Sequence, residues 1–230
     1  MELTLQSAKT VKGEKEGYLT GILYMSAADS SGVVDLCPYA SPECKYTCLG
    51  HTSGRMVMKT VQQAQLRRTL MYHQNKAHFM ELIEQDIHTV IRKAARQDLI
   101  PCFRLNGTSD QPALAMHFAE KFPDVQFYDY TKIPKPWLRT RSNYNITFSL
   151  SEDNLPDAWA SINHGINVAV VFNTKKGMKL PVEWNDYPIY DGDENDLRFL
   201  DPAYHIIGLR AKGLAKKLEP GKFVQIATGV

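Results

Sequence analysis

The sequence lacks any apolar run that approaches the roughly 20 residues required by a membrane-spanning helix. Its opening stretch, MELTLQSAKTVKGEKEG, is polar and has no apolar centre of the kind found in secretory signal peptides. We therefore expect no membrane partner and a location in the reducing cytoplasm. In that compartment, the four cysteines are expected to be metal ligands or free thiols and not disulfides.

A strong excess of charge is also missing, because 27 Lys and Arg face 25 Asp and Glu and leave a net charge of +2. This balance does not by itself indicate a nucleic-acid-binding protein. Hydrophobic residues at 43% and charged residues at 23% exclude the disordered and fibrous classes. With no internal repeat, the 230 residues predict a single domain, with a polar leader over 1–16 and a basic extension over 213–230. The basic stretch 210–222 is interpreted as a solvated surface, with contact to a nucleic acid as the alternative.

Three of the cysteines lie close together in the loop CPYASPECKYTCLGH. Cys37, Cys44 and Cys48 have the spacing C-x6-C-x3-C, and thiolates are soft ligands that suit iron–sulfur clusters, zinc or copper(I). Fully protein-ligated iron–sulfur clusters usually take four cysteines, so three would leave one iron open to a substrate or cofactor. Cys102 is interpreted as a buried core thiol. Whether Cys102 or His51 supplies a fourth ligand stays open.

Short apolar segments alternate with helical patterns along the rest of the chain. Strands are predicted over 17–26, 101–105, 125–130, 145–150, 167–172, 187–190 and 205–209, and helices over 55–97 (with a break near 72–77), 113–121 and 155–163. This alternation predicts an α/β protein built from βα units around a parallel sheet. Polar residues follow most of the strands, and barrels collect functional groups at the carboxyl ends of many strands. We therefore expect a partial or full (β/α) barrel with the cysteine loop after the first strand.

The segments RLNGTSD, FYDYTK, SLSEDN and DGDENDLRFLD follow four of these strands and supply the other candidate site residues. Asn106, Thr108 and Asp110 offer hydrogen-bond donors and acceptors to a polar ligand, and Gly107 permits a close approach of the backbone. Helix capping explains part of these patterns equally well. The candidates for catalysis or substrate contact are Arg104, Asp129, Lys132, Glu152, Asp191 and Asp193.

Taken in order, GYLTGILYMS, the cysteine loop and these four segments resemble a set of bacteriophage proteins, the gene product eighty-eight-like family. The resemblance covers roughly residues 17–212. It names a group more than an activity, and it implies a location in the cytoplasm of the phage host.

The sequence also resembles the radical S-adenosylmethionine enzymes, which are partial or full βα barrels with three cysteines in the loop after the first strand. This resemblance implies that Cys37, Cys44 and Cys48 hold a [4Fe-4S] cluster whose open iron binds the methionyl part of S-adenosylmethionine. The usual spacing in those enzymes is C-x3-C-x2-C, so the loop of this chain is longer.

The same resemblance implies the residues that contact the cofactor. It puts Asn106, Gly107 and Asp110 near the methionyl group. It puts Ser149 and Ser151 near the ribose or the methionyl carboxylate.

The sequence therefore predicts an iron–sulfur enzyme of the radical S-adenosylmethionine type that acts on a nucleotide, a nucleic-acid base or a small metabolite. One alternative is a nucleic-acid-binding protein whose fold is stabilised by a structural zinc ion, in which His51 completes a Cys₃His site. The other is a magnesium-dependent barrel hydrolase. That enzyme would use the four carboxylates of Asp110, Asp129, Asp191 and Asp193.

Overall fold

The structure is a computed structural model that describes residues 3–227. Within this range, nine strands form one sheet in the order β1-β2-β3-β4-β5-β8-β7-β6, and β9 pairs with β5 as well. The strands are β1 (Tyr18–Ile22), β2 (Ile100–Arg104), β3 (Gln126–Thr131), β4 (Tyr144–Ser149), β5 (Val168–Phe172), β6 (Glu183–Trp184), β7 (Tyr187–Asp191), β8 (Ile206–Arg210) and β9 (Val224–Gln225). All pairings are parallel except that of β6 with β7. The predicted α/β class is confirmed.

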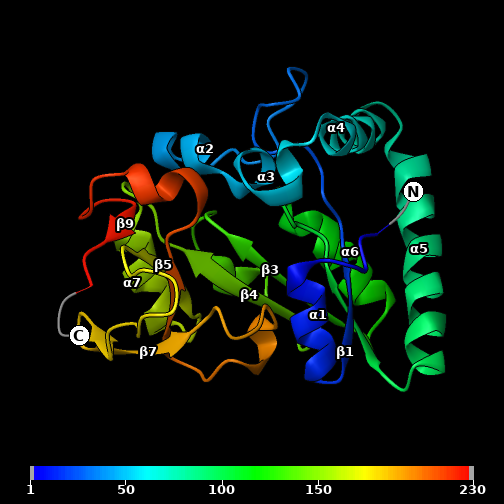
Figure 1. The fold of residues 1–230 in the computed structure, drawn as a ribbon. Helices are drawn as coiled ribbons and strands as arrows, with labels where there is room; N and C mark the ends of the chain where they lie inside the picture. The colour runs from blue at the N-terminus through cyan, green and yellow to red at the C-terminus, as the bar shows by residue number, and fades with distance from the viewer. Residues whose placement is uncertain (1–2, 228–230) are drawn as a thin grey trace.

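Helices surround this sheet (Figure 1). They are α1 (Ala8–Lys15), α2 (Pro42–Thr47), α3 (Leu49–Thr52), α4 (Lys59–Gln74), α5 (Lys76–Arg96), α6 (Pro112–Lys121) and α7 (Leu155–Asn163), with short 3₁₀ turns η1 (Gly54–Val57), η2 (Pro136–Leu138), η3 (Arg198–Leu200) and η4 (Gly213–Lys217). The cysteine loop follows β1, as predicted, and contains α2. In Figure 1, α2 and α3 lie over the carboxyl ends of the strands, beside the C-terminal segment that carries η4 and β9. None of the helices between residues 3 and 227 is long and apolar enough to cross a membrane.

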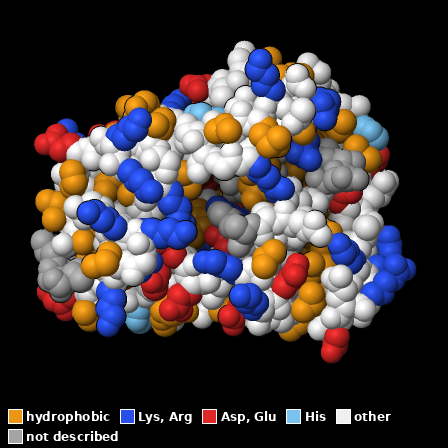
Figure 2. All heavy atoms as spheres, viewed as in Figure 1, with side chains coloured by type: hydrophobic (Ala, Val, Ile, Leu, Met, Phe, Trp, Pro, Cys, Tyr) orange, Lys and Arg blue, Asp and Glu red, His pale blue; other side chains and the backbone are white. Residues whose placement is uncertain are grey.

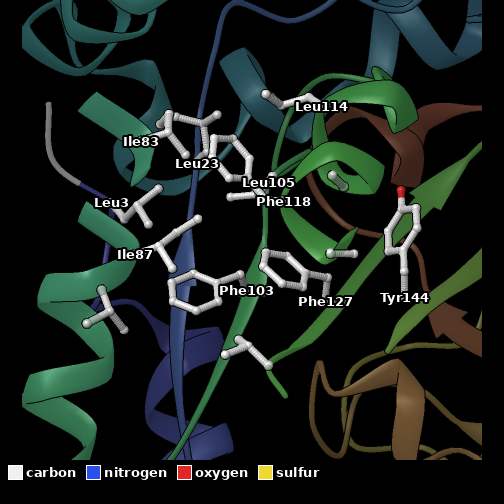
Figure 3. Close-up of a cluster of buried hydrophobic side chains, with 14 of the residues drawn as sticks. Leu3, Leu23, Ile83, Ile87, Phe103, Leu105, Leu114, Phe118, Phe127 and Tyr144 are labelled. Atoms are coloured by element: carbon white, nitrogen blue, oxygen red, sulfur yellow. The ribbon is translucent and has the colours of Figure 1, made fainter. Parts of the chain in front are cut away.

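One face of the sheet, which we call the outer face, is apolar. Phe103 of β2 and Phe127 of β3 stack on this face with ring centroids 5.4 Å apart. They pack against Ile83 and Ile87 of α5 and against Phe118 of α6 (Figure 3). The buried residues of α5 recur every three or four positions, which is the period of a helix with one apolar stripe. A second apolar cluster joins β4, β5 and α7.

The opposite, inner face of the same strands is polar, because successive side chains of a strand point to opposite faces. Its members from β2, β3 and β4 are Cys102, Arg104, Tyr128, Tyr130, Asn145, Thr147 and Ser149. Helix α1 and the segment around η3 cover part of this face. Tyr18 and Tyr128 contact the ring of Phe199 at centroid distances of 5.1 and 5.5 Å. The polar face is therefore enclosed and is the natural place for a binding site.

The sheet is not closed, so the prediction of a barrel is not confirmed and a radical-S-adenosylmethionine-like fold is not shown. In the described part of the chain, β1 does not pair with β6 or β7. The free edge of β1 is taken up instead by Thr4, whose backbone exchanges two hydrogen bonds with Ile22. The gap between the sheet edges is crossed by side chains, since Lys12 of α1 donates a hydrogen bond to the carbonyl of Asp193, beyond β7.

Several predicted elements agree with the structure. The helix predicted over 155–163 coincides with α7, and the predicted break near 72–77 falls at Asn75, between α4 and α5. The predicted polar leader contains a helix, since residues 8–15 form α1. There, the Ser7 hydroxyl accepts a hydrogen bond from the Thr10 amide at 3.2 Å, and the Thr10 hydroxyl accepts one from the Ser7 amide at 2.8 Å. In the predicted basic extension, β9 pairs with β5, and Ala215 and Phe223 form an apolar cluster that packs against Cys44 of the cysteine loop.

Candidate functional site

A cavity of about 360 Å³ lies at the carboxyl ends of the strands, between the inner face, the cysteine loop and the C-terminal segment. Figure 2 shows a hollow on this side of the molecule, with Lys and Arg side chains on its rim. The polar and thiol side chains that line the cavity are Lys12, Cys44, Thr47, Cys48, Arg104, Tyr130, Ser149, Asp193, Asn195, Asp196, Arg210 and Lys212. The apolar lining comes from Leu49, Val171, Leu209, Ala215 and Phe223. Cavities of this size suit small molecules.

The three clustered cysteines are free thiols, and two of them line the cavity. Cys44 lies in α2, and Cys48 lies between α2 and α3. The Cys37 thiol lies 3.7 Å from the carbonyl oxygen of Thr108. The pKa of Cys37 is raised to about 12, mainly by burial and to a smaller extent by the neighbouring charges of Asp110, Cys48 and Cys44. Two of the three free thiols of this loop therefore face the cavity, and burial keeps Cys37 protonated.

Glu152, from the loop after β4, holds the beginning of α2 in place. Its carboxylate accepts hydrogen bonds from the Ser41 hydroxyl at 2.6 Å and from the Glu43 amide at 2.8 Å. Glu43 in turn accepts a hydrogen bond from the amide of Phe223 at 3.2 Å. The predicted substrate residue Glu152 therefore anchors the cysteine loop and is not among the lining residues of the cavity.

Thr108 supports the other end of the loop. A Cβ on Gly50 of α3 would lie 2.7 Å from the Thr108 methyl, so only glycine fits there without a shift. The Thr108 hydroxyl donates to the carbonyl of Met25 at 2.5 Å, and Gln65 donates to the carbonyl of Gly50 at 3.1 Å. Gly107 is packed equally tightly, since a Cβ there would lie 2.7 Å from the carbonyl oxygen of Leu23. Gly107 and Thr108, which were predicted to bind the cofactor, therefore fix the backbone and do not line the cavity.

Asn106 and Asp129 form a buried pair next to the outer face. The Asp129 carboxylate accepts hydrogen bonds from the amide and the side chain of Asn106, both at 2.8 Å, and from the Tyr144 hydroxyl at 3.2 Å. The Asn106 side-chain oxygen accepts from Ser109 and Gln111. Burial nevertheless raises the pKa of Asp129 to about 7. Asn106 has no capacity left for a ligand, and Asp129 lies away from the cavity.

Asp110 and Ser151 are also committed to internal hydrogen bonds. Asp110 accepts from the Thr131 hydroxyl at 2.7 Å and from the Lys132 amide at 2.8 Å. Burial raises the pKa of Asp110 despite these donors. The Ser151 hydroxyl donates to Asp153 at 2.9 Å. Both residues hold the turns that follow β3 and β4.

Ser149 and Lys132 are the members of these two turns that reach the site. Ser149 lines the cavity, and its hydroxyl accepts a hydrogen bond from the Lys132 ammonium at 3.1 Å. The same ammonium lies 5.9 Å from the centroid of the Phe223 ring. Lys132 therefore brings a positive charge to the wall of the cavity near Cys48, where it counteracts the rise in the pKa of Cys48 that burial causes.

The acidic segment after β7 is paired with basic side chains. Arg210 makes two hydrogen bonds of 2.8 Å to the two oxygens of Asp191 and one of 3.1 Å to Asp193, and Lys212 donates to Asp193 at 2.6 Å. Burial opposes ionisation of the two carboxyls, but the hydrogen bonds from Arg210 and Lys212 outweigh it and lower the pKa of both. Asp193 lines the cavity together with both bases. The basic stretch that was interpreted as a solvated surface therefore contributes Arg210 and Lys212 to the cavity wall.

Arg104 lies at the inner face, within the cavity lining. Its Nη1 pairs with Asp196 at 2.8 Å, and the two side chains are only 8% and 13% exposed. The guanidinium carbon stands 4.6 Å from the centroid of the Tyr130 ring. The predicted substrate residue Arg104 is therefore at the site, together with Tyr130 and Asp196, which were not predicted.

The chain matches the family model described as Gene product 88 over residues 1–225. The protein belongs to the Gene product 88 family. This confirms the resemblance to the bacteriophage family, which extends beyond the segment 17–212 on which it was based. No curated protein and no solved structure matched the chain. The comparisons give no support to the resemblance to radical S-adenosylmethionine enzymes.

The candidate metal ligands of this Gene product 88 member are the three cysteines of the loop, with Cys102 or His51 as a possible fourth ligand. Among residues 3–227, no three His, Cys, Asp or Glu side chains are arranged as a ready-made metal site. The three free thiols of the cysteine loop nevertheless match, by their chemistry, what a soft metal group requires. Cys102 is buried as predicted, is 3.3 Å from the Thr20 hydroxyl and is not part of the cavity lining. His51 lies three residues after Cys48, and its buried Nδ1 has no hydrogen-bond partner within the described part of the chain.

The four predicted magnesium ligands are not brought together. Asp110 and Asp129 are held in the loops and strand described above, with Asp129 next to the outer face. Asp191 lies at the end of β7 and Asp193 in the loop after it, with β4, β5 and β8 between them and β3, and both bind Arg210. The arrangement offers no shared carboxylate site for a magnesium ion.

Sequence reasoning missed Lys12, Tyr130, Asn195, Asp196 and Phe223. The alternation of β3 carried a signal for Tyr130, since it stands on the same face as Tyr128, two residues earlier. No local pattern could have found Lys12 or Phe223, because only the tertiary fold brings the two ends of the chain to the cavity.

Proposed function

We propose that this member of the Gene product 88 family is an iron–sulfur enzyme of the radical S-adenosylmethionine type. Cys37, Cys44 and Cys48 would hold a [4Fe-4S] cluster. The observation that carries the proposal is the position of three free thiols on one loop, two of them in the lining of a cavity at the carboxyl ends of parallel strands. Three thiolates leave one iron open to a further ligand. When bound, the cluster and S-adenosylmethionine would supply one-electron chemistry that no side chain offers.

The residues of the chain would first keep the ligands in position. Glu152 fixes the start of α2 through Ser41 and Glu43, which lie three residues and one residue before Cys44. Tight packing of Gly50 against Thr108 fixes α3, just after Cys48. A ligand loop that is held at both ends retains its geometry while the bound group and the substrate change.

The chain would also orient the cofactor and exclude water. Ser149 is the member of the predicted cofactor set that lines the cavity, and Lys132 fixes its hydroxyl. The residues Asn106, Gly107, Thr108 and Asp110 would act through the shape of their loop. On the other side, Phe223 and Ala215 form an apolar cluster that packs against Cys44 and shields this part of the site.

The functional test is cleavage of S-adenosylmethionine. Protein reconstituted anaerobically with iron and sulfide is reduced with dithionite and mixed with S-adenosylmethionine, and methionine release is measured by chromatography. We expect release with the natural protein and with Cys102→Ser, and none with Cys44→Ala. Equal release by Cys44→Ala and the natural protein would refute the proposal.

The buried Nδ1 of His51, which has no hydrogen-bond partner among residues 3–227, favours one alternative, a zinc site of the type Cys₃His. Such a site would be structural, and the protein would then be a binding module with an affinity for nucleic acid that falls steeply with salt. A His51→Ala variant separates the two proposals. It would lose metal if His51 is a ligand, and would keep its cluster if the three cysteines are sufficient.

A further inference from the structure

The inner wall of the cavity contains a charged side chain with unused hydrogen-bonding capacity. Arg104 is 7% exposed and lines the cavity. Within residues 3–227, the only hydrogen bond of its guanidinium joins Nη1 to Asp196. Its buried Nε has no partner there. Buried donors are almost always satisfied in folded proteins, so this one calls for an acceptor that enters from the cavity.

The orientation of this guanidinium is fixed before any ligand arrives. Asp196 holds Nη1, and the face of the Tyr130 ring lies 4.6 Å from the guanidinium carbon. A planar guanidinium held in this way presents its remaining N–H groups as a fork. Forks of this kind match the two oxygens of a carboxylate or of a phosphate.

The charges around the cavity favour an anion as well. The cationic lining residues are Lys12, Arg104, Arg210 and Lys212, against two acidic ones, Asp193 and Asp196. Asp191 compensates one more cation by pairing with Arg210. Lys132 adds an ammonium group that forms no ion pair with the described residues and donates only to Ser149. The site therefore retains positive charge after its internal pairs are counted.

The remainder of the lining defines the rest of the ligand. Leu49, Val171 and Leu209 provide an apolar wall. Polar contacts beside Arg104 are available from Tyr130, Ser149 and Asn195, which also line the cavity. A volume of about 360 Å³ admits a small organic molecule and no folded or double-stranded polymer.

We propose that this part of the cavity is a binding site for the carboxylate or phosphate group of a small organic anion, with Arg104 as the residue that selects it. Identifying this anion as the substrate rests on the proposed iron–sulfur function, which places the reacting group near the cysteine loop. The binding itself depends on Arg104 and not on the thiols.

The test measures binding of two probes, succinate and inorganic phosphate, by calorimetric titration at matched ionic strength. We expect the natural protein to bind at least one of them, and Arg104→Lys to bind it at least tenfold more weakly. Lysine keeps the positive charge opposite Asp196 but lacks the fork, so the fold is retained while recognition is lost. Preference for succinate or for phosphate tells whether the group is a carboxylate or a phosphate.

Two controls complete the test. Arg141→Lys changes an arginine that pairs with Glu120 at the surface and should leave the affinity unchanged. Cys37→Ala removes a proposed cluster ligand that does not line the cavity. Binding in this variant equal to that of the natural protein would support the anion site even if the iron–sulfur proposal fails. Binding of neither probe by the natural protein, or equal binding by Arg104→Lys, would overturn the proposal.

Discussion

The Glu152 carboxylate accepts a hydrogen bond of 2.6 Å from the hydroxyl of Ser41, 111 positions earlier in the chain. It joins the loop after β4 to the first turn of α2, which carries Cys44. The same carboxylate accepts the amide of Glu43 at 2.8 Å. The cysteine loop is thus attached to the sheet edge that forms the cavity.

Replacing Glu152 by Ala should loosen the cysteine loop. The change leaves the amide of Glu43 without its charged acceptor, and hydrogen bonds to charged groups contribute about 1.5–3 kcal/mol. We expect a loss of this size in the free energy of unfolding, measured with urea, and a lower iron content after reconstitution. Glu120→Ala, which removes an exposed partner of Arg141, is the matched control and should change neither value. Full iron content in Glu152→Ala would show that the anchor is dispensable.

Replacing Gly50 by Ala should destabilise the contact between α3 and the loop after β2. The new methyl would lie 2.7 Å from the Thr108 methyl, and overpacking of this kind costs about 1–3 kcal/mol. The second substitution Thr108→Ser removes that methyl but keeps the hydroxyl that donates to Met25. The double variant should therefore recover part of the lost stability in the same urea titration. No recovery would mean that the remaining contacts, with the Thr108 Cβ at 3.0 Å and with Ala27 at 3.3 Å, limit the site instead.

Asp129 should make the stability depend on pH. Burial raises its pKa in the folded protein to about 7, against 3.8 for a free carboxyl, so the folded state keeps a proton that the unfolded state has lost. The contribution of the Asp129 carboxyl to the free energy of unfolding is therefore present in full below about pH 4. It is lost as the pH rises to about 7. Its slope is at most about 1.4 kcal/mol per pH unit.

The measurement is the free energy of unfolding of the natural protein minus that of Asp129→Asn, between pH 4 and 8. We expect this difference to fall with rising pH and to level off above about 7. Asp124→Asn, on the exposed turn before β3, should show no such trend. A flat difference for Asp129→Asn would mean that the three donors around this carboxylate keep it ionised.

Arg198 and Asp201 form an ion pair whose side chains are 0% and 1% exposed, at 3.3 Å. Replacing Asp201 by Asn removes the carboxylate that is paired with the buried guanidinium and leaves it only the more distant charge of Asp196, and breaking comparable buried pairs costs about 3–5 kcal/mol. The double variant Arg198→Met with Asp201→Leu removes both charges and should be clearly more stable than the single one. Thermal unfolding of the three proteins checks the order. Equal destabilisation of both variants would contradict the role of the uncompensated charge.

The sequence predicted the elements whose signal is local. The apolar stripe from Phe79 to Ala94 marked α5, and the continuous apolar run 167–172 marked β5, which is buried on both faces. The helix α1 was missed because its stability depends on a cap by Ser7 and on the burial of Thr10, and not on an apolar stripe. The strand β9 is two residues long, and only its pairing with β5 defines it.

The site was predicted only in part, because the sequence pattern reports local features and not contacts between distant segments. The clustering of Cys44 and Cys48 is a local pattern, and both line the cavity. The polar segment RLNGTSD looked equally suited to ligand binding. In the structure, however, Asn106 and Asp110 form hydrogen bonds within the protein, with Asp129 and Thr131. Nothing in the sequence distinguishes a polar side chain that stabilises a loop from one that faces a cavity. That distinction needs the partners, which come from distant strands.

The most direct test of the iron–sulfur proposal is the iron and sulfide content of anaerobically purified protein, together with its visible spectrum before and after dithionite. For the natural protein and for Cys102→Ser, we expect about four irons and four sulfides per chain and a brown colour that dithionite bleaches. For Cys37→Ala, Cys44→Ala and Cys48→Ala, we expect the loss of both. One zinc per chain and no colour in the natural protein would contradict the iron–sulfur assignment and favour the zinc site with His51.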